Sequence, residues 1–298
     1  MTLRLATRRS PLALLQAESV RSRLAARGIE AELVTVQTRG DRHSQQPLVE
    51  FAGQGAFAIE IQDAVLSGRA DAAVHSAKDL PGRTPPGLVV SAVPERRDAA
   101  DALVGRTLAA LGPGATVATG SPRRRALLLE RRPDISVVGL RGNMATRLSA
   151  LASGVDAIVA AVAALERLGL GDQVSERLDA SWFVPQVGQG ALALECRGDD
   201  DATNAALAAI DDFAAHVAVR AERAFLLELG AGCTIPAGAH AQVAVEGDIE
   251  IAGVMVGLDG GRSVRATLRG ADPEALGAAL ARRLRDDLRG SELPGWQA

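Results

Sequence analysis

The sequence predicts an α/β fold in which two doubly wound domains surround a cleft and a smaller α+β domain follows at the C-terminus. Three observations support this prediction. The chain has 298 residues, 47% of them hydrophobic, which is enough for two or three cores. Strand-like and helix-like segments alternate over the first two-thirds of the chain, as in parallel sheets covered by helices. After about residue 201 the pattern changes to helices and an antiparallel meander.

The first unit opens with a strand at Leu3–Thr7, and a helix begins at Pro11. Ser10 suits the N-cap of that helix, Pro11 suits its first position, and Gly28 suits its end. A polar loop is expected from residue 39 to about residue 54. The other elements expected here are a strand at Glu30–Thr38, a helix at Ala56–Ser67, and strands at Ala72–Val74 and Leu88–Val93.

The same alternation starts again after Pro94. Ser121 and Pro122 open a helix that runs to Arg131, and Asn143 caps another. We also expect strands at Thr116–Ala118, Ile135–Leu140 and Ala157–Ala161, and a helix at Ala163–Leu168. The C-terminal unit is expected to contain helices at Ala202–Asp211, Val217–Leu229 and Pro273–Leu288, and strands at Ala239–Val245, Ile249–Gly257 and Ser263–Arg269.

The composition excludes several classes of function. A net charge of -3 gives no general attraction to nucleic acid or to an anionic membrane. Five Phe, two Trp and no Tyr are too few for base-stacking surfaces. The longest apolar stretch, Ala157–Leu165, is too short to span a bilayer, and no signal-peptide core follows Met1. Two cysteines do not make a disulfide framework, so we expect a cytoplasmic protein with no membrane or nucleic-acid partner.

Two segments repeat one arrangement that is typical of anion sites. Ala6-Thr7-Arg8-Arg9-Ser10-Pro11 and Ala118-Thr119-Gly120-Ser121-Pro122-Arg123 each lead from a strand into a capped helix. Each places backbone N–H groups, a hydroxyl and arginine at a helix N-terminus, and this combination binds anions. Ser-Pro is also simply a good helix start, so one copy alone would indicate little. The pair predicts two anion sites that face each other across a cleft.

Lys78 is the only lysine among 33 basic residues. It lies just after a predicted strand, at the edge of the sheet where ligands of α/β folds bind. A lysine is a compact charge that can also act as a nucleophile or base, which arginine cannot. Either this position requires lysine, or a single lysine remains by chance, and the composition leaves both readings open.

The arginines gather at the ends of predicted strands. Several guanidinium groups on one cleft indicate a ligand with several carboxylates or phosphates. Neither a Walker A sequence nor G-x-G-x-x-G occurs, so we favour carboxylates. Arg125, Arg131 and Arg132 are interpreted as solvated helix charges. The gathered residues are Arg8, Arg9, Arg123, Arg124, Arg125, Arg141, Arg147 and Arg167.

Six motifs, in order along nearly the whole chain, resemble the porphobilinogen deaminase family, also called hydroxymethylbilane synthases. They are Ala6–Leu14, Thr38-Arg39-Gly40-Asp41, Ala73–Pro81, Leu140-Arg141-Gly142-Asn143 with Thr146-Arg147-Leu148, Val187-Gly188-Gln189-Gly190-Ala191, and Gly232–Gly238. The resemblance implies a monomer whose first two domains are like periplasmic binding proteins, with a return to the first domain before the third. The implied domains are residues 1–94 with 185–211, residues 95–184, and residues 212–298.

The resemblance also implies a transferase of haem biosynthesis, which deaminates four porphobilinogen molecules and joins them head to tail into hydroxymethylbilane. Its dipyrromethane primer would be held by a thioether to Cys233, whereas Cys196 is expected to be buried and inert. Asp79 matches the catalytic acid, which would stabilise positive charge on the pyrroles and relay protons. No metal ion is expected. The matches to primer contacts are Lys78, Ser10, Thr119, Ser121, Arg123, Arg124, Arg141 and Gly190, and the matches to substrate contacts are Arg8, Arg147, Arg167, Gln189 and Phe57.

The sequence departs from the family pattern at Gly120, where many relatives have Ser, and at Gln54, where Lys is common. Two other functions are consistent with the residues. A polycarboxylate-binding protein would have the same two-lobed cleft, but it gives no role to Cys233. A pyridoxal-phosphate enzyme with a Schiff base on Lys78 would need a nucleophilic lysine, whereas the adjacent Asp79 favours the charged form.

Overall fold

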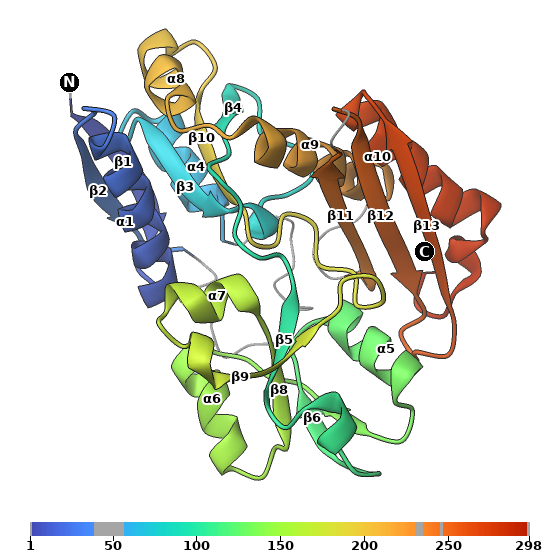
Figure 1. Ribbon diagram of the computed structural model, residues 1–298. Coiled ribbons are helices and arrows are strands. Elements are labelled where there is room, and N and C mark those ends of the chain that lie inside the picture. The colour runs from blue at the N-terminus through green and yellow to red at the C-terminus, as the bar shows by residue number, and fades with distance from the viewer. Residues whose placement is uncertain (1, 39–56, 231–234, 245–246, 297–298) are drawn as a thin grey trace.

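The structure, a computed structural model, describes residues 2–38, 57–230, 235–244 and 247–296. The described residues form three sheets, each with its own helices (Figure 1). The chain builds part of the first sheet, crosses to build the second, returns to the first with one strand, and then forms the third. The predicted fold class, two α/β units followed by an α+β unit, is confirmed.

The first sheet has the strand order β2-β1-β3-β10-β4. Helices α1 and α8 cover one of its faces, where Val20, Leu24 and Leu207 join the core, and α4 covers the other face. The strands are β1 (Leu3–Arg8), β2 (Ala31–Val36), β3 (Ala72–Ser76), β4 (Leu88–Ala92) and β10 (Leu192–Arg197), and the helices are α1 (Pro11–Ala25), α4 (Ile59–Leu66) and α8 (Asp201–Ala208).

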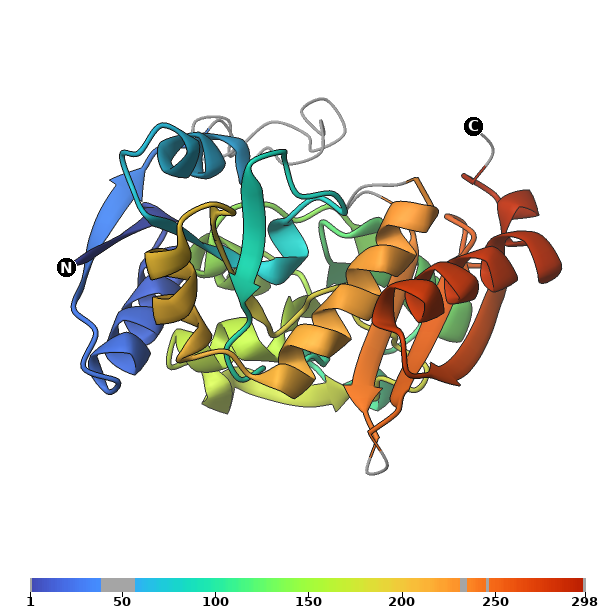
Figure 2. The same cartoon turned by 90° about the horizontal axis from the view of Figure 1, so that it is seen from above.

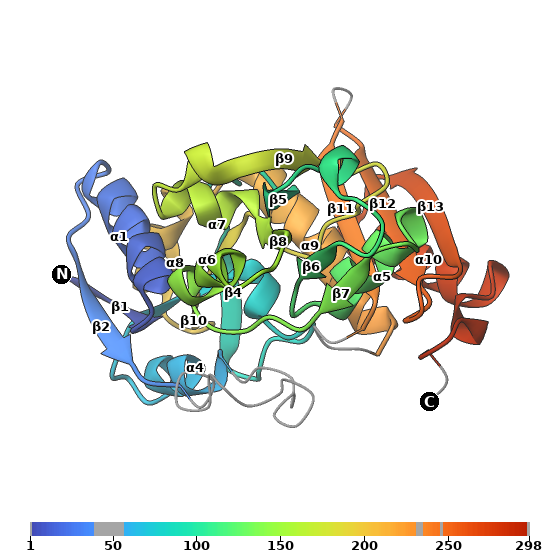
Figure 3. The ribbon, with the colours of Figure 1, turned by 90° about the horizontal axis from the view of Figure 1, so that it is seen from below.

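The second sheet has the order β7-β6-β8-β5-β9. Helix α5 packs on one face, and α6 and α7 pack on the other. Helix α7 also contacts α1, so the two α/β units meet there (Figure 3). The strands are β5 (Asp101–Gly105), β6 (Thr116–Ala118), β7 (Ser136–Val138), β8 (Ala157–Ala161) and β9 (Val174–Leu178), and the helices are α5 (Pro122–Arg131), α6 (Met144–Ala152) and α7 (Val162–Arg167).

The expected parallel pairing joins β1 to β2 and β3, and β6 to β7 and β8, but one strand of each of these two sheets runs the other way. β10 runs antiparallel to β3 and β4, and β5 runs antiparallel to β8 and β9. β5 and β10 each enter their sheet directly after the chain has crossed between the two units, so no βαβ crossover fixes their direction. Strands β5 and β9 were not predicted from the sequence, and Cys196 lies inside β10. Cys196 is buried, as expected.

The third unit contains the predicted antiparallel meander β11-β12-β13. Helices α9 and α10 lie side by side along it (Figure 2), and Leu276, Leu280 and Phe225 fill the core between them and the sheet. The elements are α9 (Phe213–Glu228), β11 (Ala237–Val243), β12 (Ile249–Val256), β13 (Ser263–Gly270) and α10 (Pro273–Arg282). The last helix continues as a π-helical turn over Arg283–Asp287.

Four short 3-10 helices complete the described elements, η1 (Ala77–Asp79), η2 (Leu108–Ala110), η3 (Gly171–Gln173) and η5 (Gly290–Glu292). The third unit packs on both of the others. Val254 and Val256 of β12 join the core of the second unit, and Ala215 and Val219 of α9 join a core of the first. Within the described residues, no helix combines the length and apolar character needed to cross a bilayer.

Candidate active site

The short helix η1 places Lys78 and Asp79 at the carboxyl end of β3. β1 lies parallel and next to β3, so Arg8 at its end reaches the same edge. The Arg8 Nη1 lies 4.0 Å from Asp79 Oδ2, and the Arg8 guanidinium lies 4.1 Å from the centre of the Phe57 ring. The Asp79 side chain is about one-third exposed. Three residues far apart in the sequence, Arg8, Phe57 and Asp79, therefore meet.

The two repeated helix starts form as predicted. Ser10 caps α1 by accepting the backbone N–H of Ala13, and Ser121 caps α5 by accepting that of Arg124. Thr119 is buried, and its hydroxyl accepts the backbone N–H of Ser121 at 3.3 Å. Both helices begin with proline, which loses nothing there because the first N–H groups of a helix have no intrahelical partner.

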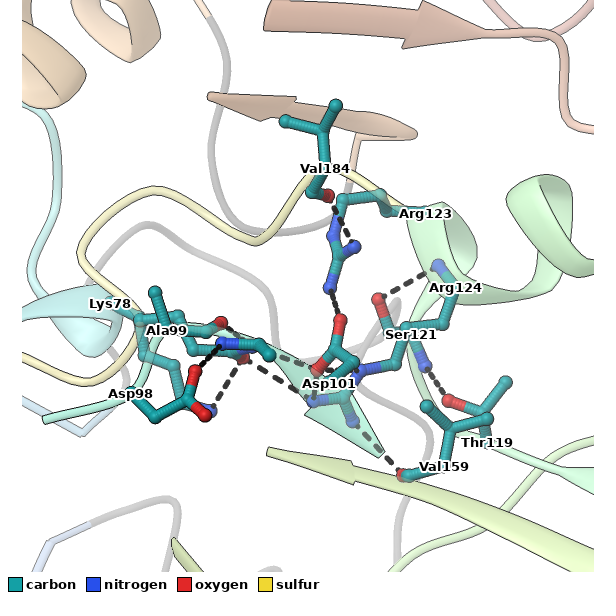
Figure 4. A network of polar contacts seen from close by, with 12 residues as sticks. Lys78, Asp98, Ala99, Asp101, Thr119, Ser121, Arg123, Arg124, Val159 and Val184 are labelled. Atoms are coloured by element: carbon teal, nitrogen blue, oxygen red, sulfur yellow. Dashed lines mark hydrogen bonds and ion pairs between the residues drawn. The ribbon is translucent and has the colours of Figure 1, made fainter. Parts of the chain in front are cut away.

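A buried network lies behind the start of α5 (Figure 4). At its centre Asp101, the first residue of β5, is completely buried. Its carboxylate accepts from Arg123 Nη2 at 2.7 Å, from Arg124 Nη2 at 2.6 Å and from Arg124 Nε at 3.1 Å. Arg123 also donates to the carbonyl of Val184, and Arg124 donates to that of Val159. Both arginines are therefore fixed by internal partners.

Gln189 links this network to Lys78. Its side chain is completely buried, and its amide nitrogen donates to Ala99 O at 2.7 Å and to Asp101 Oδ1 at 2.8 Å. Its amide oxygen accepts from Lys78 Nζ and from Arg124 Nη2, each at 3.3 Å. The Lys78 ammonium thus lies beside Asp79 on one side and the arginine network on the other.

Burial lowers the pKa of Lys78 to about 8, and the positive charge of Arg124 adds to this effect. Asp79 and Asp101 act in the opposite direction. The expectation that Asp79 favours the charged form of Lys78 is confirmed. Loss of hydration outweighs this effect, because a buried charge is poorly solvated, and the pKa of Lys78 is lowered overall.

The remaining predicted arginines fall into two places. Arg147, near the start of α6, donates through Nε to Gly142 O, and burial followed by Arg124 lowers its pKa while Asp79 raises it. The positive charge of Arg141 also lowers the pKa of Arg147, so these two arginines are neighbours. We call Arg141 and Arg147 the cationic wall beside Asp79. Arg167 lies elsewhere. Burial, then Arg97 and Arg23, lower its pKa to about 10, and its Nη2 donates to Gly190 O at 2.9 Å.

Gly190 requires glycine for two reasons. Its φ of +85° lies in the left-handed region, and a Cβ there would lie 2.4 Å from the carbonyl oxygen of Arg97. The close contact brings the segment before β5 and the segment before β10 together, which places Gln189 against the buried network. The geometry gives Gly190 a backbone role in shaping the site.

Asp101 was not predicted as a site residue. A single acidic residue between alanines matches no motif, and its arginine partners lie about twenty residues away on another element. Cys233 and Gln54 lie outside the described residues. Ile235, the first described residue after Cys233, lines a small pocket of about 20 Å³ together with Lys78, Ser121 and Phe225.

The charges of this site fit an anionic ligand. Lys78, Arg124 and Arg147 influence one another, and Asp79 and Asp101 are the carboxylates that act on Lys78. Arg8 adds a further cation beside Asp79. A partly exposed carboxylate among several cations suits a molecule with carboxylate arms around a centre that becomes positive. A dipyrromethane, which has carboxylate arms on pyrrole rings, fits these residues.

Comparison with known families assigns the chain. The family model described as porphobilinogen deaminase, dipyromethane cofactor binding domain, matches residues 3–205, and the model for the C-terminal domain of that enzyme matches residues 216–286. The chain belongs to the porphobilinogen deaminase family. The family inferred from the six motifs is thereby confirmed, and its cofactor-binding region spans both α/β units.

Relatives named porphobilinogen deaminase are similar over nearly the whole chain. The relative from Roseiflexus sp. (strain RS-1) is 46% identical over 293 residues, 96% of either chain. The relative from Syntrophotalea carbinolica is 45% identical and covers 95% of this chain and 92% of its own. Among solved structures, the methionine binding protein MetQ is 12% identical, with a TM-score of 0.44 over 70% of this chain and 88% of its own.

Proposed function

We propose that this chain catalyses the porphobilinogen deaminase reaction, in which four porphobilinogen molecules lose ammonia and are joined head to tail into hydroxymethylbilane. The observation that carries the proposal is the partly exposed Asp79 carboxylate between Arg8 and Lys78, on a chain of this family. The deaminated ring becomes positive, so a fixed carboxylate stabilises it. At ~4 Å and an effective dielectric near 20, such a pair contributes roughly 4 kcal/mol, or up to about a thousandfold in rate.

The dipyrromethane primer, when bound, supplies the terminal pyrrole carbon to which each new ring is joined. Lys78 offers a point charge to one of its carboxylates, and Arg124 and Arg141 add positive charge. The hydroxyls of Ser10, Ser121 and Thr119 lie at the two helix starts. Arg123 is buried against Asp101, Val184 and the ring of Phe183, so we assign it the task of holding Asp101 rather than contact with the primer.

The incoming substrate also carries carboxylates, and Arg8 and Arg147 are placed to bind them beside Asp79. Phe57 supports the Arg8 guanidinium from one side. Arg167 donates to Gly190 O and has Arg97 and Arg23 as neighbouring cations, and we assign it contact with the growing chain. All donors and lone pairs of the Gln189 amide are engaged inside the protein, so its expected substrate contact is replaced by a supporting role.

Cys233 is the proposed attachment point of the primer. Ile235, two positions further along the chain, lines the pocket that Lys78 and Ser121 also line. Two residues of chain reach at most about 7 Å, so the described end of this loop supports attachment near Lys78. A thioether needs a reduced thiol, which the cytoplasm maintains, so we place the protein there. We also propose that the protein acts as a monomer, as the resemblance to the family implies.

The domain boundaries near residues 94, 184 and 211 are part of the proposal. Sheet membership changes between β4 and β5, between β9 and β10, and again between β10 and β11. Each proposed boundary falls in one of these three intervals. Residues 185–211, which hold β10 and α8, would then complete the first domain.

A Schiff-base enzyme on Lys78 is the second candidate. The lowered pKa of Lys78 favours it, because a fraction of the amine is neutral near pH 7. It gives no role to the cationic wall beside Asp79. A bound pyridoxal Schiff base absorbs visible light, whereas a dipyrromethane gives colour only with an Ehrlich-type aldehyde reagent, so the two candidates differ in the spectrum of the purified protein.

The deciding experiment is the intact mass of the purified protein. We expect a mass above that of the chain by two linked pyrrole units, on the peptide that holds Cys233. Cys233→Ala should carry no adduct and show no turnover. Cys196→Ala is the matched control, because Cys196 is buried in β10, and it should keep both. An adduct on Cys196, or full activity without any adduct, would overturn the proposed function.

A further inference from the structure

Asp101 belongs to an arrangement that a structural salt bridge alone would not need. A buried carboxylate between two arginines is common, since burial of a charge requires a partner. Here the carboxylate has a third partner, the amide nitrogen of Gln189 at 2.8 Å. That amide leads directly to the ammonium of Lys78.

The orientation of the Gln189 amide follows from its neighbours. Its nitrogen faces two acceptors, the carbonyl of Ala99 and the carboxylate of Asp101. Its oxygen must then face the opposite way, toward Lys78 and Arg124, which are both donors. The reverse orientation would direct N–H groups at two cations and an oxygen at a carboxylate. Asp101 therefore determines that Lys78 has an acceptor inside the protein.

We propose that Asp101 is a positioning residue of the primer site, which fixes Arg124 and the Gln189 amide and, through that amide, the Lys78 ammonium. The proposal rests on the proposed function, because it assigns the fixed ammonium to a carboxylate of the primer. Lys78 Nζ donates to the Gln189 amide oxygen, and this buried partner fixes the place of the ammonium.

Charge supports the same role. Four groups from four elements act on Lys78: Asp79 of η1, Asp101 of β5, Arg124 of α5 and Arg147 of α6. The arginines and burial lower its pKa, and the two carboxylates raise it. Without the Asp101 charge, the positive field of Arg124 and Arg123 is no longer balanced. The ammonium should then lose its proton at a lower pH.

The chain allows a direct test because Lys78 is its only lysine. Protein labelled with 13C at the lysine ε carbon gives one lysine NMR signal, and its pH titration reports on Lys78 alone. Asp101→Asn should lower the titration midpoint by about one pH unit. Asp286→Asn is the matched control. Asp286 pairs with Arg285 at the surface of the C-terminal unit, so the midpoint should not move.

Loss of primer must be separated from loss of Asp101, because primer carboxylates also stabilise the ammonium. The titrations are therefore repeated in the Cys233→Ala background, where wild type and variants both lack primer. An unchanged midpoint for folded Asp101→Asn in this background overturns the proposal. If Asp101→Asn does not fold, Gln189→Met decides, because it keeps the arginine pairs of Asp101 and removes the acceptor of Lys78. Gln189→Met should lower the titration midpoint of Lys78, and an unchanged midpoint would again contradict the proposal.

The two claims fail in different ways. If wild-type protein carries no primer, the proposed function is wrong, but the effect of Asp101 on the pKa of Lys78 can still be measured. If the primer is present and Asp101→Asn does not change the pKa of Lys78, only the positioning role is wrong. Intact mass and the lysine signal are measured on the same labelled sample.

Discussion

At the scale of single residues, the arginines of the site differ in whether their guanidinium groups already have partners inside the protein. Arg123 and Arg124 are bound to Asp101 and to backbone carbonyls, so they act as fixed charge. Arg147 makes a backbone contact through Nε, and Asp79 is close enough to raise its pKa. The predicted arginines thus have different tasks, and the difference depends on Asp101, a carboxylate from another element.

The role of Asp79 can be tested by removing its charge while keeping its shape. Asp79→Asn should lower turnover by at least about a hundredfold, because an amide cannot stabilise a positive pyrrole as a carboxylate does. The primer should remain attached. The measurement is kcat together with intact mass, with Asp286→Asn as the control at a surface pair of the C-terminal unit. Turnover near that of wild type would make Asp79 a structural residue.

Arg147 and Arg131 form a matched pair for the cationic wall. Arg147→Leu should stall elongation, so covalent complexes with one to three added rings should accumulate and be visible by mass. Arg131 is exposed on α5 and lies over the Trp182 ring at 5.4 Å, so Arg131→Leu should leave the distribution unchanged. Similar accumulation in both variants would mean that the wall has been assigned to the wrong arginines.

Only some residues of the site could be predicted from the sequence. The family motifs identified Lys78, Asp79, Arg8 and Arg147. Asp101 gave no such signal, since a lone acid in an alanine-rich segment is ordinary. The lowered pKa of Lys78 could not be predicted either, because burial depends on how the three units pack.

At the scale of elements, helix starts were predicted well and strand directions were not. Ser10, Ser121 and Asn143 all cap helices as predicted, because a cap is decided within four residues. The direction of β5 and β10 depends on where the chain crosses between units, which local patterns do not encode. The site uses both kinds of information, since η1 follows β3, and β10 lies beside β3.

The cap of α6 offers a test at this scale. Asn143 accepts the backbone N–H of Thr146 at 2.9 Å, and the next residue is Arg147. Asn143→Ala should cost about 1 kcal/mol of stability and slow elongation by loosening the first turn of α6. Asp272→Ala is the control, because Asp272 caps α10 in the same way, in the C-terminal unit. It should lower the Tm similarly and leave elongation normal. A slowing in both variants would indicate a general effect of stability.

At the scale of the whole molecule, one carboxylate joins the three units. Glu222 of α9 is completely buried. It accepts from Arg96 Nη1 at 2.6 Å, from the Gly188 N–H at 2.6 Å and from the Ala241 N–H at 2.8 Å. Arg96 lies on the way from β4 to β5, and Gly188 lies on the return to β10. Arg96 also donates to Gln189 O, so the junction continues toward Lys78.

This junction makes the fold sensitive to acid. Burial alone would raise the pKa of Glu222, but Arg96 and His240 outweigh it and hold the pKa at about 2, against 4.5 for an ordinary glutamate. A carboxylate with a depressed pKa stabilises the folded state fully above its unfolded pKa and loses that contribution as pH falls through its folded pKa. The stability of wild type should therefore decline as pH falls from about 4.5 toward 2.

Glu222→Gln tests both consequences at once. At pH 7 it leaves the Arg96 charge buried without its partner, which should cost about 3–5 kcal/mol and lower the Tm by ~10 °C. Below about pH 4.5 the stability gap to wild type should narrow, because Glu222 becomes protonated in the unfolded wild-type chain and its ionisation then contributes less to folding. Glu274→Gln is the control, since Glu274 pairs with Arg220 at the surface and should change stability by less than about 1 kcal/mol. The measurement is thermal unfolding by circular dichroism at pH 7, 4 and 3. A gap between Glu222→Gln and wild type that stays constant across this range would show that ionisation of Glu222 does not hold the three units together.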